Sequence, residues 1–312
     1  MINRFTILIV SLNIIFGSVP DASGVNGAVT SSNKFASDVG INILKDGGNA
    51  VDAAIAVGFA LAVVHPGAGN IGGGGFMVIR LADGTKTTID FRETAPQKAS
   101  RDMFLDENGD IIEGKSWSTS WASGVPGSVA GFGLAHEEFG TLKWSQLIDS
   151  SIQLARDGYS LNYNDANSFN RYNDFLTKDS VTRTIFVRDE EFKTGDILVQ
   201  RNLASTLERI SRAGWEEFYT GKTADLIQKC MERTDGLISK NDLKNYIAVQ
   251  RDPITFSYRD HIVYSMPPAS SGGIALAGIL NQLENIDLSS LPFHGADHIH
   301  YLTECQRRVY AD

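Results

Sequence analysis

The stretch that decides the fold is residues 50–91: AVDAAIAVGFALAVV at 50–64, HPGAGNIGGGG at 65–75, and FMVIRLADGTKTTIDF at 76–91. The first segment is apolar nearly all round, which predicts a helix in the middle of a core. His65-Pro66 is expected to end it. In the last segment, Asp83-Gly84 is a pair favoured in two-residue hairpin turns, which predicts two antiparallel strands. The order is therefore helix, glycine loop, hairpin.

The hairpin register makes Arg92 a candidate ligand-binding residue. With a two-residue turn, Ala82 pairs with Thr85, and Arg92 then faces Gly75 while Glu93 faces Gly74. An arginine at a strand end beside flexible backbone is suited to bind a ligand carboxylate through two parallel hydrogen bonds. The alternative is a surface ion pair of Arg92 with its acidic neighbours.

The glycine loop itself does not indicate a nucleotide site. A dinucleotide-binding fingerprint requires a strand, then glycines, then a helix, and here a helix precedes the glycines and a strand follows them. The loop also lacks the Gly-Lys-Ser/Thr ending of a phosphate-binding loop. Four successive glycines instead favour a close approach of neighbouring backbone.

Outward from this stretch the pattern predicts mainly helices. We expect Ser32 to cap the first of them, and Ser239 with Asp242 forms a capping-box pattern before another. Strands are expected over 247–256 and 262–264. Helices are expected over 33–45, 129–139, 144–157, 202–213, 222–233, 272–283 and 296–312, and 161–175 is expected to be irregular or helical surface. The last helical pattern reaches Asp312 without a stop signal, so we expect an incomplete chain.

Composition limits the class of protein. The chain has 312 residues, 42% of them hydrophobic, with 28 basic and 37 acidic residues and a net charge of −9. This balance argues against nucleic acid or an anionic membrane surface as partner. Cys230 and Cys305 lie far apart, without the spacing of a structural zinc site, and their redox state stays open. No linker or repeat divides residues 27–312, which we expect to form one domain.

Residues 1–26 are expected to be a secretory signal peptide. A short charged start, a dozen-residue apolar stretch and small residues after it are typical of such signals. An uncleaved anchor or a buried first helix is the alternative. The predicted localisation is therefore periplasmic or secreted, with no membrane attachment after cleavage.

Two further patterns have ordinary explanations. Ser31-Ser32-Asn33-Lys34 matches the S-x-x-K motif of penicillin-recognising enzymes, but no S-D-N or K-T-G partner follows, and a serine is expected at a helix start. A histidine cluster near the end of the chain has spacing that does not place all its members on one helical face, so we predict no metal site there. Its members are His294, His298 and His300, with Asp297.

The ordered set of motifs resembles the γ-glutamyltransferase family. The matching segments are 27–32, 46–54 (DGGNAVDAA), 70–77 (NIGGGGFM), 90–96 (DFRETAP), 124–131 (GVPGSVAG), 218–221, 265–273 (SMPPASSGG) and 307–312. They span essentially all of residues 27–312. The similarity is greatest to exported bacterial members that cleave glutathione.

The resemblance implies an α+β, helix-rich N-terminal-nucleophile hydrolase fold, an αββα sandwich of which this chain holds the large-subunit part. It implies a precursor that cuts itself into two subunits, and a γ-glutamyl group passed to a threonine that begins the small subunit. Water, amino acids or dipeptides then accept the group from this threonine. By the same resemblance Arg92 holds the donor's α-carboxylate, and Asp90 and Glu93 could orient its guanidinium. No metal or organic cofactor is implied.

The resemblance also implies what the chain lacks. The family's catalytic threonine lies beyond the position of Asp312, so no threonine here is a candidate nucleophile, including Thr141, Thr220 and Thr303. We therefore expect glutathione and related γ-glutamyl compounds as substrates, with the small subunit of the same precursor as partner and no activity of this chain alone. A glutaryl or cephalosporin acylase of the same superfamily, or a non-catalytic relic, is the alternative.

Overall fold

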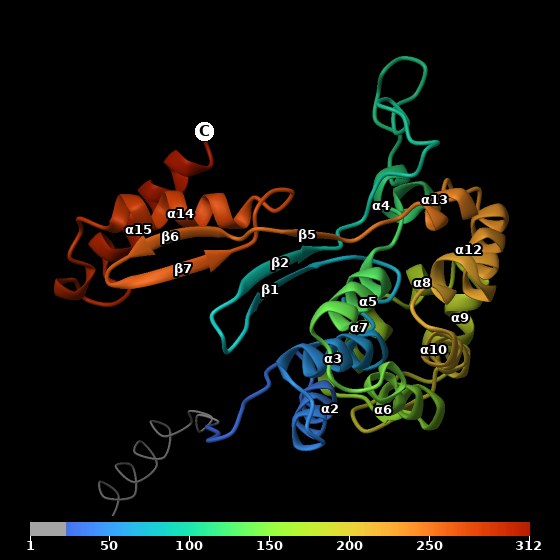
Figure 1. Cartoon of the computed structure of the whole chain (residues 1–312). Coiled ribbons are helices and arrows are strands. Elements are labelled where there is room, and N and C mark those ends of the chain that lie inside the picture. The colour runs from blue at the N-terminus through green and yellow to red at the C-terminus, as the bar shows by residue number, and fades with distance from the viewer. Residues whose placement is uncertain (1–22) are drawn as a thin grey trace, which may run out of the picture.

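The computed structural model describes residues 23–312, and helices dominate it (Figure 1). Most of the expected signal peptide lies outside the described residues. The helical elements in the first two thirds of the chain are α2 (Lys34–Lys45), α3 (Ala50–Val64), α4 (Lys115–Ser118), η1 (Ser120–Ala122), α5 (Ser128–Phe139), α6 (Trp144–Asp157), α7 (Tyr163–Arg171), α8 (Asn173–Leu176), α9 (Ser180–Phe186), α10 (Arg201–Ala213), α11 (Glu217–Thr220), α12 (Lys222–Arg233) and α13 (Lys240–Lys244). The remaining ones are α14 (Gly272–Leu283), η2 (Leu288–Ser290) and α15 (Ala296–Val309).

Helix α3 is the centre of the core, as its apolar sequence predicts. It packs against α2, α5 and α6, and the Phe59 ring is fully buried. Phe59 meets Phe132 of α5 at a ring-centroid distance of 5.0 Å and Trp144 of α6 at 5.6 Å, both edge to face. The N-terminus of α3 is fixed by a capping box between Asn49 and Asp52.

Within residues 23–312, three antiparallel sheets accompany the helices. Their strands are β1 (Phe76–Arg80), β2 (Lys86–Asp90), β3 (Tyr159–Ser160), β4 (Ile197–Leu198), β5 (Val249–Arg251), β6 (Ile254–Tyr258) and β7 (His261–Ser265). The largest sheet has the order β1-β2-β5, while β3-β4 and β6-β7 form separate pairs. The expected strand over 247–256 is thus two strands, and Asp252-Pro253 lies between them because proline donates no ladder hydrogen bond.

The predicted hairpin is present, but its register is shifted by one residue. Phe76 pairs with Asp90 and Arg80 with Lys86, and Leu81 N donates to Thr85 O at 2.9 Å. The loop therefore has three residues, with Gly84 at φ +91°. Such a loop is a common hairpin connection, in which a type I turn is followed by a left-handed glycine. The prediction of a two-residue turn was wrong.

The first helix is capped by Asn33, not by Ser32. The Asn33 side chain accepts a hydrogen bond from Phe35 N at 2.9 Å. Ser31 Oγ bonds Ser37 Oγ at 2.8 Å, and Lys34 forms an ion pair with Asp38 at 2.6 Å. The S-x-x-K pattern therefore marks a helix start here.

The C-terminal elements form a projecting unit. Helices α14 and α15 pack on each other, and α14 also covers the β6-β7 hairpin. Figure 1 shows this unit extending away from the helical part, beyond the β1-β2 hairpin. Within residues 23–312, every helix is too short or too polar to cross a membrane.

Candidate active site

Arg92 follows β2 directly and lies beside the glycine loop. Phe91 pairs with Gly75 through hydrogen bonds of 3.1 and 3.3 Å, so Arg92 is opposite Gly74, one position from the Gly75 expected. Because side chains alternate along a strand, this register sends Phe91 into the core, where it is 5% exposed and meets Phe132 at 5.8 Å. Arg92 is exposed.

The glycine loop serves close packing. A Cβ on Gly74 would lie 2.5 Å from Phe91 O, a distance that no side chain tolerates. Gly73 O accepts hydrogen bonds from Gly127 N and Ser128 N at 2.7 and 3.0 Å, which joins the loop to the start of α5. The close approach expected of the four glycines is thus present at Gly74 and Gly75, which lie against Phe91, whereas a Cβ on Gly72 would meet no neighbour.

Three contacts hold Arg92. Its backbone N donates to Asp90 Oδ1 at 3.1 Å, and its carbonyl accepts from Tyr246 OH at 2.8 Å. The guanidinium Nη1 donates to Ala269 O at 3.0 Å. Among the described residues, the guanidinium makes this single hydrogen bond. Its Nε–H, both Nη2 protons and the second Nη1 proton therefore remain available to donate to a ligand. The side chain therefore offers an unused donor fork.

The two acidic neighbours of Arg92 do not contact its guanidinium. Asp90 is 8% exposed, and its Oδ2 accepts from Arg251 Nε at 3.1 Å. Asp90 thus links the Arg92 backbone to Arg251 of β5. Glu93 is exposed and forms no ion pair within the described part of the chain. Orientation of the Arg92 guanidinium in this structure comes from Ala269 O.

Tyr246 and Ala269 were missed by sequence reasoning. Tyr246 lies 154 residues from Arg92 and Ala269 lies 177 residues away, so spacing carried no information about them. Burial raises the pKa of Tyr246, and the negative charges of Asp90 and Glu93 raise it further. The hydroxyl therefore stays a proton donor to the Arg92 carbonyl.

The Tyr246 ring belongs to an aromatic pair under the site. It stacks on Tyr219 with a centroid distance of 5.7 Å and an interplanar angle of 13°. Tyr219 OH in turn donates to Pro126 O at 3.0 Å and accepts from Ala130 N at 3.0 Å. This pair connects the Arg92 backbone to the first turn of α5.

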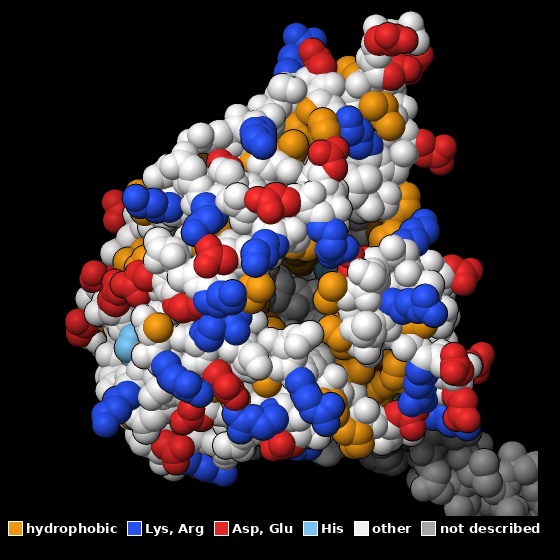
Figure 2. All heavy atoms as spheres, turned by 90° about the vertical axis from the view of Figure 1, so that its right-hand side faces the viewer, with side chains coloured by type: hydrophobic (Ala, Val, Ile, Leu, Met, Phe, Trp, Pro, Cys, Tyr) orange, Lys and Arg blue, Asp and Glu red, His pale blue; other side chains and the backbone are white. Residues whose placement is uncertain are grey.

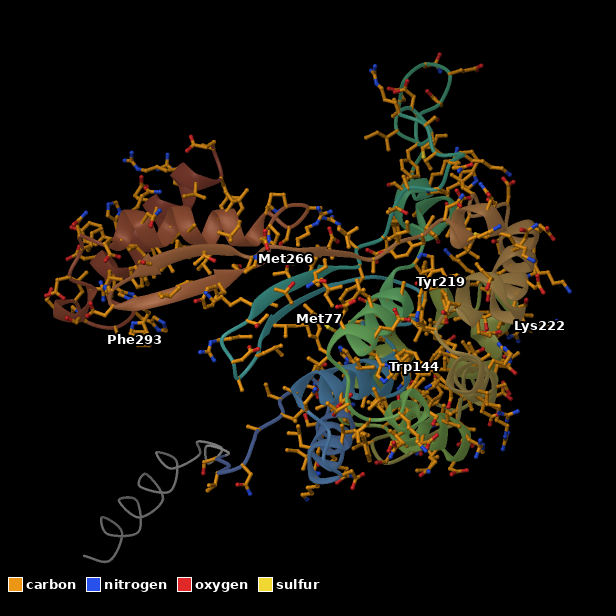
Figure 3. All side chains as sticks on the ribbon, viewed as in Figure 1. Met77, Trp144, Tyr219, Lys222, Met266 and Phe293 are labelled. Carbon is orange, nitrogen blue, oxygen red and sulfur yellow. The ribbon has the colours of Figure 1, made fainter. Side chains whose placement is uncertain are left out.

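A cavity of about 580 Å³ opens beside this network. Its lining consists of Thr87, Gln250, Arg251, Asp252, Pro267 and Pro268. The cavity lies where the projecting unit joins the main sheet. In Figure 3, Met266 just after β7 and Met77 on β1 lie near this junction.

The threonines and histidines that the sequence analysis set aside lie outside this site. Thr141 Oγ1 donates to the buried Asp52 at 2.5 Å, and Thr220 Oγ1 donates to Glu216 O at 2.9 Å. Thr303 is exposed on α15. The His294 ring stacks on Phe293, the His298 ring is tilted against Phe293, and the His300 ring meets Tyr301. No group of three metal-ligating side chains occurs within residues 23–312.

Comparison with known proteins supports the assignment that the motifs suggested. The family model described as gamma-glutamyltranspeptidase matches residues 36–312. The glutathione hydrolase proenzyme of Escherichia coli strain K12 is 49% identical over 288 residues, which are 92% of this chain and 50% of that protein. The acylase ACY 1 proenzyme of Pseudomonas sp. strain V22 is 36% identical over 93% of this chain and 53% of its own length. The chain thus spans about half the length of these relatives.

A solved structure agrees in fold. The crystal structure of Helicobacter pylori gamma-glutamyltranspeptidase superposes with a TM-score of 0.91 at 44% identity, over 94% of this chain and 84% of that one. This match confirms the expected helix-rich α+β fold of N-terminal-nucleophile hydrolases. Together the motifs, the fold and these matches show that the chain belongs to the gamma-glutamyltranspeptidase family.

Proposed function

We propose that this chain is the donor-binding part of a γ-glutamyltransferase, or glutathione hydrolase, precursor. The whole protein would transfer the γ-glutamyl group of glutathione or a related donor to water, an amino acid or a dipeptide. The observation that carries this proposal is the Arg92 guanidinium, held by Ala269 O with its other donors free. Two parallel N–H donors match the two oxygens of the donor's α-carboxylate.

The chemical step requires a nucleophile from the other half of the precursor. A threonine hydroxyl at the start of the small subunit would attack the γ-carbonyl carbon, its own α-amino group taking the proton and passing it to the leaving amine. Backbone N–H groups would stabilise the oxyanion. Water or an amine would then release the glutamyl group from the threonine.

Exposed apolar side chains support a second half that covers this one. Val78 on β1, Ile247 before β5 and Ile262 on β7 are 48%, 76% and 62% exposed. Val78 and Ile262 lie on strands, and Ile247 lies in the segment that leads into β5. Because β1, β5 and the β6-β7 pair also have open edges in the described part of the chain, further chain of the whole protein could pair with these strands and cover the apolar side chains.

The expected signal peptide supports export of the protein to the periplasm or the medium, and the proposal includes this localisation. Its test is the N-terminal residue of the mature protein, which a signal peptidase would place near residue 27. A mature protein that begins at Met1 or Ile2 would contradict export through this route.

Substitution of Arg92 tests the donor role in a protein of full precursor length. Arg92→Ala should raise the KM for a γ-glutamyl anilide about 10- to 100-fold, because a charge-assisted contact with the carboxylate is lost. Arg92→Lys should recover part of the effect. The matched control is Arg101→Ala, since Arg101 is an exposed arginine outside the site. An unchanged KM in Arg92→Ala would refute the role.

An acylase is the alternative that a specific observation favours, because the acylase proenzyme shares 36% identity with this chain. Comparing kcat/KM for glutathione with that for a glutaryl-cephalosporin separates the two activities. A higher value for the cephalosporin would overturn the glutathione assignment. Absence of both activities at full precursor length would indicate a non-catalytic relic.

A further inference from the structure

A large groove lies on the face formed by α8, α9, α10 and α12, apart from the Arg92 network. It has a volume of about 1140 Å³, and four segments line it, within residues 117–123, 175–182, 202–209 and 226–234. Figure 2 shows a hollow on this face with Lys and Arg side chains gathered around it. None of the lining residues contacts Arg92, so the proposed donor site does not account for this α9–α12 groove.

The groove is positively charged in an acidic protein. Its lining carries four basic side chains, Lys178, Arg209, Lys229 and Arg233, and one acidic side chain, Asp179, whereas the whole chain has a net charge of −9. Such a local excess of one charge sign attracts ligands of the opposite sign.

The two arginines of the groove each lie beside a carboxylate of this chain. Arg233 Nη1 holds the Asp179 carboxylate at 2.7 Å, and Arg209 Nε lies 3.4 Å from the Glu217 carboxylate. Lys178 and Lys229 are exposed, and neither forms an ion pair within residues 23–312. The Lys178 ammonium lies over the Phe175 ring at 5.5 Å from its centroid, and neither ammonium is neutralised by a carboxylate of the described residues. Both can therefore meet carboxylates of a ligand.

Apolar side chains share the groove with these cations. Trp117 is 71% exposed and Phe175 is 42% exposed, and their rings stack at a centroid distance of 6.3 Å and an interplanar angle of 14°. Val181 and Leu226 are exposed at 48% and 43%. Four large apolar side chains in one groove provide a surface that a small inorganic anion would leave uncovered.

We propose that the α9–α12 groove binds an acidic peptide segment that also carries apolar side chains. Carboxylates would meet Lys178 and Lys229, and apolar side chains would cover Trp117 and Leu226. The volume exceeds the roughly 300–1,000 Å³ of typical small-molecule pockets, which favours a peptide over a single metabolite. Aromatic and basic residues in one cleft are also the side chains that dominate binding at peptide and protein interfaces.

The test uses a fluorescein-labelled octapeptide in which Glu alternates with Leu, and measures its fluorescence anisotropy with the protein of full precursor length. The same peptide with Gln in place of Glu should bind about tenfold more weakly. Rising salt concentration should lower the affinity of the Glu peptide for the protein. Equal affinity for the Glu and Gln peptides, or no binding of either, would overturn the proposal.

Charge reversal locates the site. The double variant with Lys178→Glu and Lys229→Glu should lower the affinity for the Glu peptide about tenfold or more. Lys45→Glu with Lys98→Glu changes the net charge by the same amount at exposed lysines outside the groove and should leave the affinity nearly unchanged. Equal losses in both double variants would show attraction by the whole molecule and would refute this site.

Cys230 gives an independent footprint. It is a free, half-buried cysteine in the groove lining, whereas Cys305 is buried in α15. The bound Glu peptide should slow the alkylation of Cys230 by N-ethylmaleimide, a rate that mass spectrometry measures. The Cys230→Ser variant shows which alkylated product comes from Cys230. A Cys230 rate that the saturating peptide leaves unchanged would place the peptide elsewhere on the protein.

Discussion

Tyr246→Phe tests whether distant packing positions Arg92. The substitution removes one hydroxyl and keeps the ring that stacks on Tyr219. The lost interaction is the 2.8 Å hydrogen bond to the Arg92 carbonyl, made by a side chain that is 8% exposed. A buried neutral hydrogen bond of this kind contributes about 1 kcal/mol to stability. The free energy of unfolding in urea should fall by about that amount.

The same change should reach donor binding in the full-length precursor. If the Tyr246 bond holds Arg92 in its binding position, 1 kcal/mol of lost positioning corresponds to about a fivefold rise in donor KM. The value of kcat should change less, because the guanidinium is expected to bind the carboxylate and takes no part in proton transfer. Kinetics with a γ-glutamyl anilide measure both constants.

The control is Tyr258→Phe on β6. The Tyr258 hydroxyl has no hydrogen bond within the described residues, and the Arg259 guanidinium lies over its ring. This variant should change neither the stability nor the KM. If Tyr246→Phe lowered stability but left the KM unchanged, Tyr246 would be structural only, and the reasoning about Arg92 would be refuted.

Three further predictions concern the scaffold. Asp52→Ala should lower the free energy of unfolding in urea by about 3 kcal/mol, because Asp52 is fully buried and accepts from the Thr141 hydroxyl and backbone; a loss below 1 kcal/mol would contradict this. Gly131→Ala should cost about 1–3 kcal/mol in the same assay and raise the donor KM, since its Cβ would lie 2.2 Å from the Phe91 ring. The pKa of Asp179 is lowered to about 2, mainly by the hydrogen bond from the Thr182 backbone N–H and next by Arg233. The stabilisation from the Asp179 carboxylate should therefore be present above about pH 4 and be lost as the pH falls towards 2. An Asp179→Asn variant with the same acid unfolding profile as the unchanged protein would refute this.

Helix positions could be predicted from the sequence because their determinants are local. The bounds of α3, α6, α12 and α14 agree with the expected ranges. In each case the apolar spacing and a nearby cap or stop residue lie within a few turns of each other. The first helix shows the limit of this reasoning, since Ser32 and Asn33 are both good caps and only the backbone geometry selects Asn33.

The hairpin register could not be predicted, because the turn residues allow two solutions. Asp83-Gly84 suits a two-residue turn, and it equally suits a three-residue loop that ends with a left-handed glycine. The packing decides between them: the observed register buries Phe91 against Phe132 and leaves Arg92 exposed. A slip of one residue would exchange these two side chains between core and solvent.

The site illustrates a second limit. The family motif pointed to Arg92, and the chemistry of its guanidinium explains why an arginine is suited to hold a carboxylate. What holds Arg92 in place comes from Tyr246 and Ala269, which reach it only through the fold. Neither residue type nor spacing identifies such partners, since a backbone carbonyl or a tyrosine hydroxyl carries no signature in sequence.

Three separate segments of this chain hold Arg92. Asp90 fixes its backbone locally, Tyr246 ties it to the segment between α13 and β5, and Ala269 ties it to the loop before α14. Under the proposed function, the groups that position Arg92 for the donor carboxylate therefore come from this chain. Because positioning and attack lie on different chain segments, substitutions around Arg92 should act mainly on donor KM, and those at the nucleophile should act on kcat.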